Sequence, residues 1–228
     1  MKRSKRYNES TKQVDQTMKY LPSDAIEALS KLPQPKFDAT YELHYSFQAP
    51  KKEQTQPIRG SLVFPNKFGA EARIVVLAEE EKQADAKKAG AEYAGLEDLV
   101  KKIDGGWSDF DVVIATPKVM PLIARLGKVL GPKGLMPNPK TGTVTEDLAK
   151  AIETYKSGKV DYKSDDGFNI HLTFGKVSMK AEEVLENLDV ALKEVTKSGK
   201  SALNTPPRGA YVQTSMGPSL KLNLENYL

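Results

Sequence analysis

The residues with the most suggestive chemistry lie in one Gly- and Pro-rich segment, residues 127–140, with the sequence GKVLGPKGLMPNPK. Glycines beside a lysine can form a phosphate-binding loop, whose pattern is G-x4-G-K-[ST] directly after a strand. Here three residues separate Gly127 from Gly131, Pro132 has no N–H to donate, and no Ser or Thr follows Lys133. The spacing argues against nucleotide binding. The apolar residues of the segment instead predict a fixed, irregular loop with one buried side.

The two histidines of the chain, His44 and His171, are the next candidates for acid–base or metal chemistry. Neither has a nucleophile and a base at a recognisable spacing, and a zinc site needs about three or four clustered ligands. The chain has no cysteine, which excludes thiolate metal sites, a cysteine nucleophile and a disulfide framework. We therefore interpret both histidines as polar side chains on an open sheet face. We expect no catalytic residue, no metal and no cofactor.

The composition fits a globular protein with a polyanionic partner. The 228 residues are 39% hydrophobic and 28% charged, with a net charge of +4, which is enough to form one large or two modest domains. Residues 1–67 hold the basic excess, with 12 Lys and Arg against 7 Asp and Glu. Such a basic end is typical of nucleic-acid binding or of a solubilising tail. No apolar run approaches the roughly 20 residues that span a bilayer, and we expect no secretory signal.

Both ends of the chain show the patterns of half-buried strands and amphipathic helices. Apolar residues alternate over residues 37–47 and predict a strand whose core face includes Phe37 and Phe47. The other face of this strand carries Thr40, Glu42 and His44. Further strands are predicted over residues 59–64, 160–162, 168–174, 210–213 and 220–224. Helices are predicted over residues 22–32 and 180–197, and Gly199 is predicted to end the second one.

The middle of the chain alternates short apolar strands with helices. Strands are predicted over residues 74–78, 91–94 and 112–115. Helices are predicted over residues 80–88, 96–103, 118–126 and 146–155, the last one capped by Thr145. This alternation is typical of a parallel sheet covered on both faces. The sequence therefore predicts a fold of mixed α/β and α+β class: a discontinuous α+β domain of residues 1–67 and 159–228, with an inserted Rossmann-like α/β domain of residues 68–158.

The segment of residues 126–140 resembles the signature of the large-subunit ribosomal protein L-one family, which combines Leu-Gly, Gly-Pro-x-Gly-Leu-Met-Pro and Asn-Pro. The signature positions are Gly127, Gly131, Pro132, Gly134, Met136 and Pro137. The resemblance extends over almost the whole chain, through residues 5–7, 36–42, 58–65, 161–177 and 214–218.

The resemblance implies a non-enzymatic protein of the large-subunit stalk, present as a monomer within the cytoplasmic ribosome or that of an organelle, with no membrane partner. It implies three RNA partners: large-subunit ribosomal RNA, deacylated transfer RNA whose release from the exit site the stalk assists, and the protein's own messenger, whose translation it represses. The residues assigned to RNA binding are Lys36, Phe37, Thr40, Glu42, Lys163, Asp165, His171, Thr214, Ser215, Met216 and Gly217.

The chain departs from the family pattern at two places near these residues. Asp166 stands where the family carries a Lys. The segment between Tyr211 and Thr214 is shorter than in the family, which leaves the register of the last strands open. The alternative interpretation is an α/β nucleotide-binding enzyme or module, and the missing phosphate loop argues against it.

Overall fold

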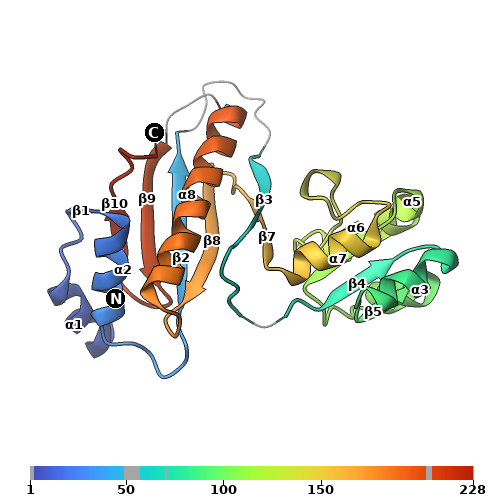
Figure 1. Ribbon diagram of the computed structural model, residues 1–228, viewed down its shortest axis with the longest axis horizontal. Helices are drawn as coiled ribbons and strands as arrows, with labels where there is room; N and C mark the ends of the chain where they lie inside the picture. Colours follow the sequence, from blue (N-terminus) through green and yellow to red (C-terminus); the bar gives the residue numbers. More distant parts are fainter. Residues whose placement is uncertain (1–2, 49–56, 70, 204–206, 228) are drawn as a thin grey trace. The chain divides into compact units, whose positions relative to one another are not determined.

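The computed structural model describes residues 3–48, 57–69, 71–203 and 207–227, which group into two compact units (Figure 1). The terminal unit combines Met1–Gly69 with Val160–Leu228, and the middle unit is Ala70–Lys159. Helices pack on sheets in both units, so the fold is of the mixed α and β class.

The terminal unit is built on a five-stranded sheet with the order β1-β10-β9-β2-β8. Its strands are β1 (Lys19–Tyr20), β2 (Thr40–Phe47), β8 (Asn169–Lys176), β9 (Pro207–Thr214) and β10 (Leu220–Leu222). β2 pairs antiparallel with both β8 and β9, so the neighbours of this strand come from the other end of the chain. A second sheet joins β3 (Arg59–Val63) to β7 (Lys159–Lys163).

One face of the five-stranded sheet carries the core of this unit. The described helices here are α1 (Lys5–Gln13), α2 (Pro22–Lys31) and α8 (Ala181–Leu203). Every second residue of β2 from Tyr41 to Phe47 is buried, and apolar residues of α2 and α8 pack against them. Figure 1 shows α2 and α8 in front of the sheet. The alternate residues of β2, from Thr40 to Ser46, are half-buried and line the opposite face, which we call the open face.

The middle unit has a three-stranded parallel sheet with the order β5-β4-β6. Its strands are β4 (Ile74–Leu77), β5 (Tyr93–Gly95) and β6 (Val112–Ala115). Every residue of β4 is buried, because the strand is covered on both faces. One face packs against α4 (Glu97–Asp104) and the helical turns that follow β6, and the other against α3 (Glu80–Lys88) and α7 (Leu148–Lys156).

The segment after β6 is a chain of short helical turns and not the single helix predicted over residues 118–126. The turns are η1 (Pro117–Val119), α5 (Met120–Ile123), η2 (Ala124–Leu126), α6 (Gly127–Leu130) and η3 (Pro139–Thr141). The start of the Gly- and Pro-rich segment is therefore helical, and the irregular part begins at Gly131. Pro121 explains the break near the start of α5, since a proline lacks the N–H of a helical hydrogen bond.

The predicted buried side of this segment is confirmed. Leu130 and Pro137 are buried, Met136 is half-buried, and Leu130 and Met136 belong to the core on one face of the middle sheet. Gly131 lies where a Cβ would approach the carbonyl oxygen of Gly127 to 2.4 Å, so only glycine fits. No phosphate loop is formed here, because the apolar side chains turn inward and pack on the sheet.

Hydrogen bonds around Asn138 close the segment. Its backbone N–H donates to Oγ1 of Thr143 over 2.6 Å, and its carbonyl oxygen accepts from the same hydroxyl over 3.0 Å. Its side chain accepts from the backbone N–H of Lys140 over 2.9 Å. Thr143 is buried, so these bonds satisfy polar groups that water does not reach.

Several predicted element ends are wrong. α8 continues through Gly199 to Leu203. A Cβ at position 199 would lie 2.1 Å from the ring of the buried Phe47, so this glycine is a packing residue and not a helix stop. α7 is capped by Asp147 and not by Thr145, since the Asp147 side chain accepts from the backbone N–H of Lys150. Phe37 precedes β2 and is 53% exposed, so it does not face the core.

Candidate nucleic-acid interface

The start of β2 and the end of β9 bring most of the predicted RNA-binding residues together. Tyr41 pairs with Thr214 across the two strands. The backbone N–H of Ser215 donates to the carbonyl oxygen of Thr40 over 2.9 Å, and the backbone N–H of Thr40 donates to Oγ of Ser215 over 3.2 Å. Residues 36–42 and 214–217, far apart in the sequence, therefore form one surface, which we call the turn site.

Glu42 links the turn site to the sheet through two hydrogen bonds. Its Oε1 accepts from the Ser215 hydroxyl over 3.1 Å, and its Oε2 accepts from Nε2 of Gln213 over 2.9 Å. These bonds orient the Ser215 hydroxyl and hold the carboxylate against the sheet. Both carboxylate oxygens of Glu42 therefore have partners within the protein.

The turn from Thr214 to Gly217 has an unusual backbone. Gly217 donates its N–H to the carbonyl oxygen of Thr214 over 2.8 Å, and Met216 between them has a φ of 60°. A positive φ is uncommon in residues other than glycine, and such residues often lie at functional positions. A Cβ at position 217 would lie 2.4 Å from Oγ1 of Thr214, so the turn requires glycine. The turn leaves the Met216 side chain 70% exposed.

Thr214, another residue assigned to RNA binding, is buried beneath the turn. Its side chain is only 2% exposed and packs beneath Gly217. The hydroxyl therefore supports the turn from below and is not presented to a ligand. The assignment of Thr214 to RNA binding stays a prediction.

Arg6 supports the turn site and was not predicted to belong to it. One guanidinium nitrogen donates to the carbonyl oxygen of Pro33 over 3.0 Å and another to the carbonyl oxygen of Met216 over 2.9 Å. The side chain thus ties α1 to the segment before β2 and to the turn. The sequence showed Arg6 only as part of a basic end, because its two acceptors are backbone atoms that leave no pattern.

Exposed side chains at the turn site offer apolar and cationic contacts. Phe37 is 53% exposed, and Lys36 beside it is also exposed. Asp38, the next residue, has partners within the protein. Its carboxylate accepts a hydrogen bond from the Ser178 hydroxyl over 2.9 Å and lies 3.7 Å from Nζ of Lys176. The site therefore presents an aromatic ring, the thioether of Met216 and a cation.

The remaining predicted residues lie toward the other end of the sheet, around the turn between β7 and β8. Lys163 and Asp165 are both exposed. Asp165 accepts from the backbone N–H of Asn169 over 2.7 Å and from Nδ2 of Asn169 over 3.0 Å. The hydrogen bond from the Asn169 side chain is the largest of the causes that lower the pKa of Asp165, so this carboxyl is ionised at neutral pH. Asp166 is exposed at the tip of the turn.

His171 and His44 connect the two ends of the open face. They pair across β8 and β2, and their Nδ1 atoms lie 2.7 Å apart. Nε2 of His44 lies 3.6 Å from Oε2 of Glu42, and Nε2 of His171 lies 3.5 Å from Oδ2 of Asp165. Burial lowers the pKa of His44, and the nearby His171 adds to this effect. The interpretation of both histidines as polar residues of an open sheet face is confirmed.

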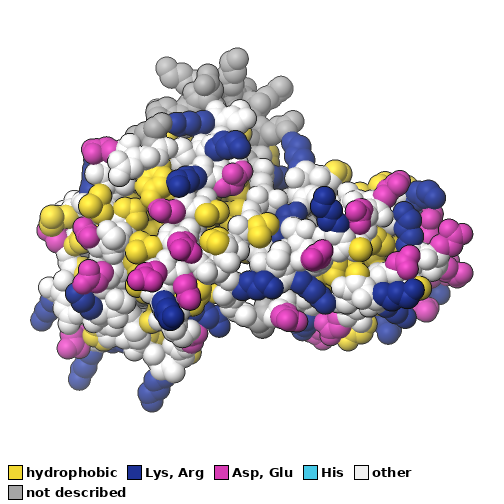
Figure 2. All heavy atoms as spheres, viewed as in Figure 1, with side chains coloured by type: hydrophobic (Ala, Val, Ile, Leu, Met, Phe, Trp, Pro, Cys, Tyr) yellow, Lys and Arg dark blue, Asp and Glu magenta, His cyan; other side chains and the backbone are white. Residues whose placement is uncertain are grey.

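The opposite face of the terminal unit is formed by α8 and carries acidic and apolar side chains (Figure 2). Figure 2 shows acidic side chains gathered among apolar ones over α8, and no histidine is visible on this face. Glu182 and Glu186 of α8 are exposed. The open face, in contrast, presents hydroxyl, carboxylate and imidazole groups from Thr40, Glu42 and His44.

The described residues offer neither a metal site nor a membrane-spanning helix. Within the described ranges, no three or more His, Cys, Asp or Glu side chains are placed to hold a metal ion. None of the helices in the described part of the chain is long and apolar enough to cross a membrane.

Comparison with known proteins identifies relatives of the whole chain. The model of the ribosomal protein L1p/L10e family matches residues 28–218. A protein of Limosilactobacillus fermentum named large ribosomal subunit protein uL1 is 42% identical over 231 residues. The protein of the same name from Limosilactobacillus reuteri subsp. reuteri is 41% identical over 227 residues. Each comparison covers 99% of this chain and 99% of the relative.

Proposed function

The chain belongs to the ribosomal protein L1p/L10e family, and we propose that it binds large-subunit ribosomal RNA through the turn site of its terminal unit. Proteins of this family are structural components of the ribosome and not enzymes, so the chain is a non-catalytic protein of the large subunit in the cytoplasmic ribosome. In this proposal the terminal unit is the RNA-binding domain and the middle unit is a second domain inserted into it.

The backbone of the Thr214–Gly217 turn is the observation that supports this site most strongly. Small side chains and bare backbone at Ser215 and Gly217 allow a close approach to the wide, shallow minor groove of RNA, where 2′-hydroxyls are displayed. The unusual φ of Met216 is maintained although it is unfavourable, which is expected where the conformation serves binding.

The exposed side chains around the turn supply the other contacts that RNA requires. Phe37 is positioned at the rim to stack on an unpaired base, and Lys36 to contact a phosphate. Phosphate contacts fix the orientation of the RNA, whereas the turn and the aromatic ring select its shape.

Two finer roles are part of the proposal and rest on the family resemblance. We propose that the ribosome-bound protein assists release of deacylated transfer RNA from the exit site. We also propose that the free protein represses translation of its own messenger, because a messenger that repeats the ribosomal RNA structure would occupy the same turn site. Addition of the ribosomal RNA fragment should then relieve repression in a cell-free translation reaction.

Competition binding tests the main proposal. The full chain should bind a fragment of the large-subunit stalk RNA more tightly than a scrambled hairpin at the same salt concentration. Thr40→Ala and Met216→Ala should weaken this binding about fivefold or more, the loss of a typical contact of about 1 kcal/mol, with little change in melting temperature. Met18→Ala is the matched control, since Met18 is also exposed but lies outside the site.

Two results would count against the proposal. Equal affinity for the stalk RNA and the scrambled hairpin would contradict the proposal that the chain binds this RNA specifically. Unchanged affinity in Thr40→Ala and Met216→Ala, with a large fall in melting temperature, would show that these residues stabilise the fold and do not bind RNA.

A further inference from the structure

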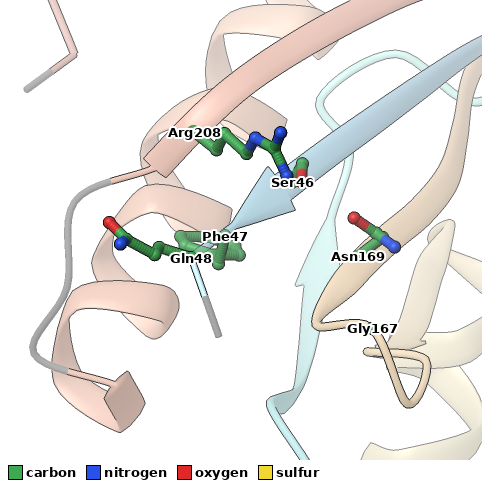
Figure 3. Close-up of a pocket in the computed structure, with 6 residues that line it drawn as sticks. All are labelled: Ser46, Phe47, Gln48, Gly167, Asn169 and Arg208. Atoms are coloured by element: carbon green, nitrogen blue, oxygen red, sulfur yellow. The ribbon is translucent and has the colours of Figure 1, made fainter. Parts of the chain in front are cut away.

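The end of the open face farthest from the turn site contains a β-bulge. Ser46 pairs with Gly209, but Phe47 pairs with Pro207, so Arg208 is the extra residue of β9. A bulge redirects the side chain of its extra residue. In Figure 3 the side chain of Arg208 extends over the sheet to Ser46, and Arg208 is exposed. The bulge therefore presents a cation at the edge of the open face.

A hollow of about 560 Å³ lies beside this guanidinium (Figure 3). Its lining residues are Ser46, Phe47, Gln48, Gly167, Asn169 and Arg208. Gly209 pairs with Ser46 and is buried, with side-chain atoms of Tyr211 and Lys221 close to it. Ser46 is half-buried and lines the hollow with its side chain.

The two sides of the hollow differ in charge. Arg208 lies on one side, and on the other Asn169 donates its Nδ2 to the carboxylate of Asp165. Figure 3 shows the amide oxygen of Asn169 directed toward the Ser46 side, where it can accept a hydrogen bond. Asp165 disfavours an anion next to Asn169. An occupant should therefore place a negative group at Arg208 and a hydroxyl donor at Asn169.

We propose that this hollow binds one backbone nucleotide of the RNA, with the phosphate at Arg208 and the ribose 2′-hydroxyl between Ser46 and Asn169. The proposal rests on the proposed function and extends the interface along β2, about 20 Å from Thr40 to Ser46 at roughly 3.4 Å per residue. A guanidinium can bind phosphate with two parallel hydrogen bonds. The acceptor at Asn169 selects RNA over DNA, because only RNA has the 2′-hydroxyl.

Salt-dependent binding of the full chain to the stalk RNA fragment tests the phosphate contact. Arg208→Gln should weaken binding about fivefold to tenfold, and it should reduce the slope of log affinity against log salt by about 0.7 to 0.9, the loss of one phosphate contact. Arg208→Lys should keep the slope. The matched control is Arg125→Gln, an exposed arginine of the middle unit, which should leave both quantities unchanged.

Single 2′-deoxy substitutions in the RNA test the sugar contact. One position should weaken binding to the wild-type chain, and Ser46→Ala should remove that effect, as a double-mutant cycle would show. The subsite is overturned, and the proposed function stands, if Arg208→Gln matches Arg125→Gln while the wild type still prefers the stalk RNA. If the wild type shows no such preference, both proposals are overturned.

Discussion

Nδ1 of His44 lies 2.7 Å from Nδ1 of His171, although the two residues are 127 positions apart. In such a contact one nitrogen must donate and the other must accept, so the two rings cannot both be fully protonated without breaking it. Glu42 lies near the outer nitrogen of His44, and Asp165 near that of His171. The contact is therefore strongest with at most one extra proton shared by the two rings.

This contact predicts a dependence of stability on pH. Burial, with a smaller contribution from His171, lowers the pKa of His44 below its ordinary value of 6.5. The unfolded chain therefore takes up a proton near pH 6.5 that the folded chain does not, so the free energy of unfolding falls as the pH drops from 6.5 toward the folded pKa. Melting temperatures at about pH 7.5 and 5.5 should differ more for the wild type than for His44→Gln, which does not titrate.

The partner residue provides the control for this pH effect. His171→Gln removes the imidazole that helps to lower the pKa of His44, so this pKa should move toward its ordinary value and the pH effect should shrink. A pH dependence that is the same in the wild type and in His44→Gln would show that the pair does not control stability in this range.

The bonds from Arg6 to the carbonyl oxygens of Met216 and Pro33 predict an effect on both stability and binding. Arg6→Ala should lower the free energy of unfolding by about 1 kcal/mol, since hydrogen bonds from a charged donor are stronger than neutral ones but these are partly exposed. It should also weaken RNA binding, because the turn that holds Met216 loses a tether. Urea denaturation and binding of the stalk RNA measure the two effects.

Lys12→Ala serves as the control for Arg6, because it removes a positive charge from an exposed position of the same helix. Comparable losses of RNA affinity in both variants would assign the effect of Arg6 to general charge and not to the turn.

Gly199 predicts a packing effect near the C-terminal end of α8. A Cβ at this position would lie 2.1 Å from the ring of Phe47, which is buried. Gly199→Ala should therefore lower the free energy of unfolding by about 1–3 kcal/mol, the usual effect of overpacking, despite the better helix propensity of alanine. In the control Gly127→Ala, the added methyl group meets no atom within 4 Å. Thermal denaturation should show a lower stability only for Gly199→Ala. Equal stability of Gly199→Ala and Gly127→Ala would contradict the packing argument.

Elements with strong local patterns could be predicted closely. The helix predicted over residues 80–88 is α3, and the strand predicted over residues 112–115 is β6. The alternation in β2 also placed Glu42 and His44 on the polar face. These predictions succeed because the periodicity of side chains along one element depends on that element alone.

Other features depended on neighbours that are distant in the sequence. Gly199 has the sequence character of a helix end, but the ring of Phe47 makes it an interior packing position. The helix α1 was not predicted from the sequence. Its Arg6 binds backbone carbonyl groups, and such acceptors cannot be recognised from residue types. The buried position of Thr214 likewise follows from the shape of the turn above it.

The register between β2 and β9 is the clearest feature that the sequence of either strand alone does not determine. The shortened segment before Thr214 left this register open, and in the structure Tyr41 pairs with Thr214 while a bulge at Arg208 absorbs the mismatch at the other end. Motif spacing and alternation were sufficient for the family and for the mixed α and β class of the fold, because each is written in neighbouring residues. The turn site, the histidine pair and the hollow at Arg208 required strands from both chain ends to pair in one register, which only long-range hydrogen bonding and core packing select.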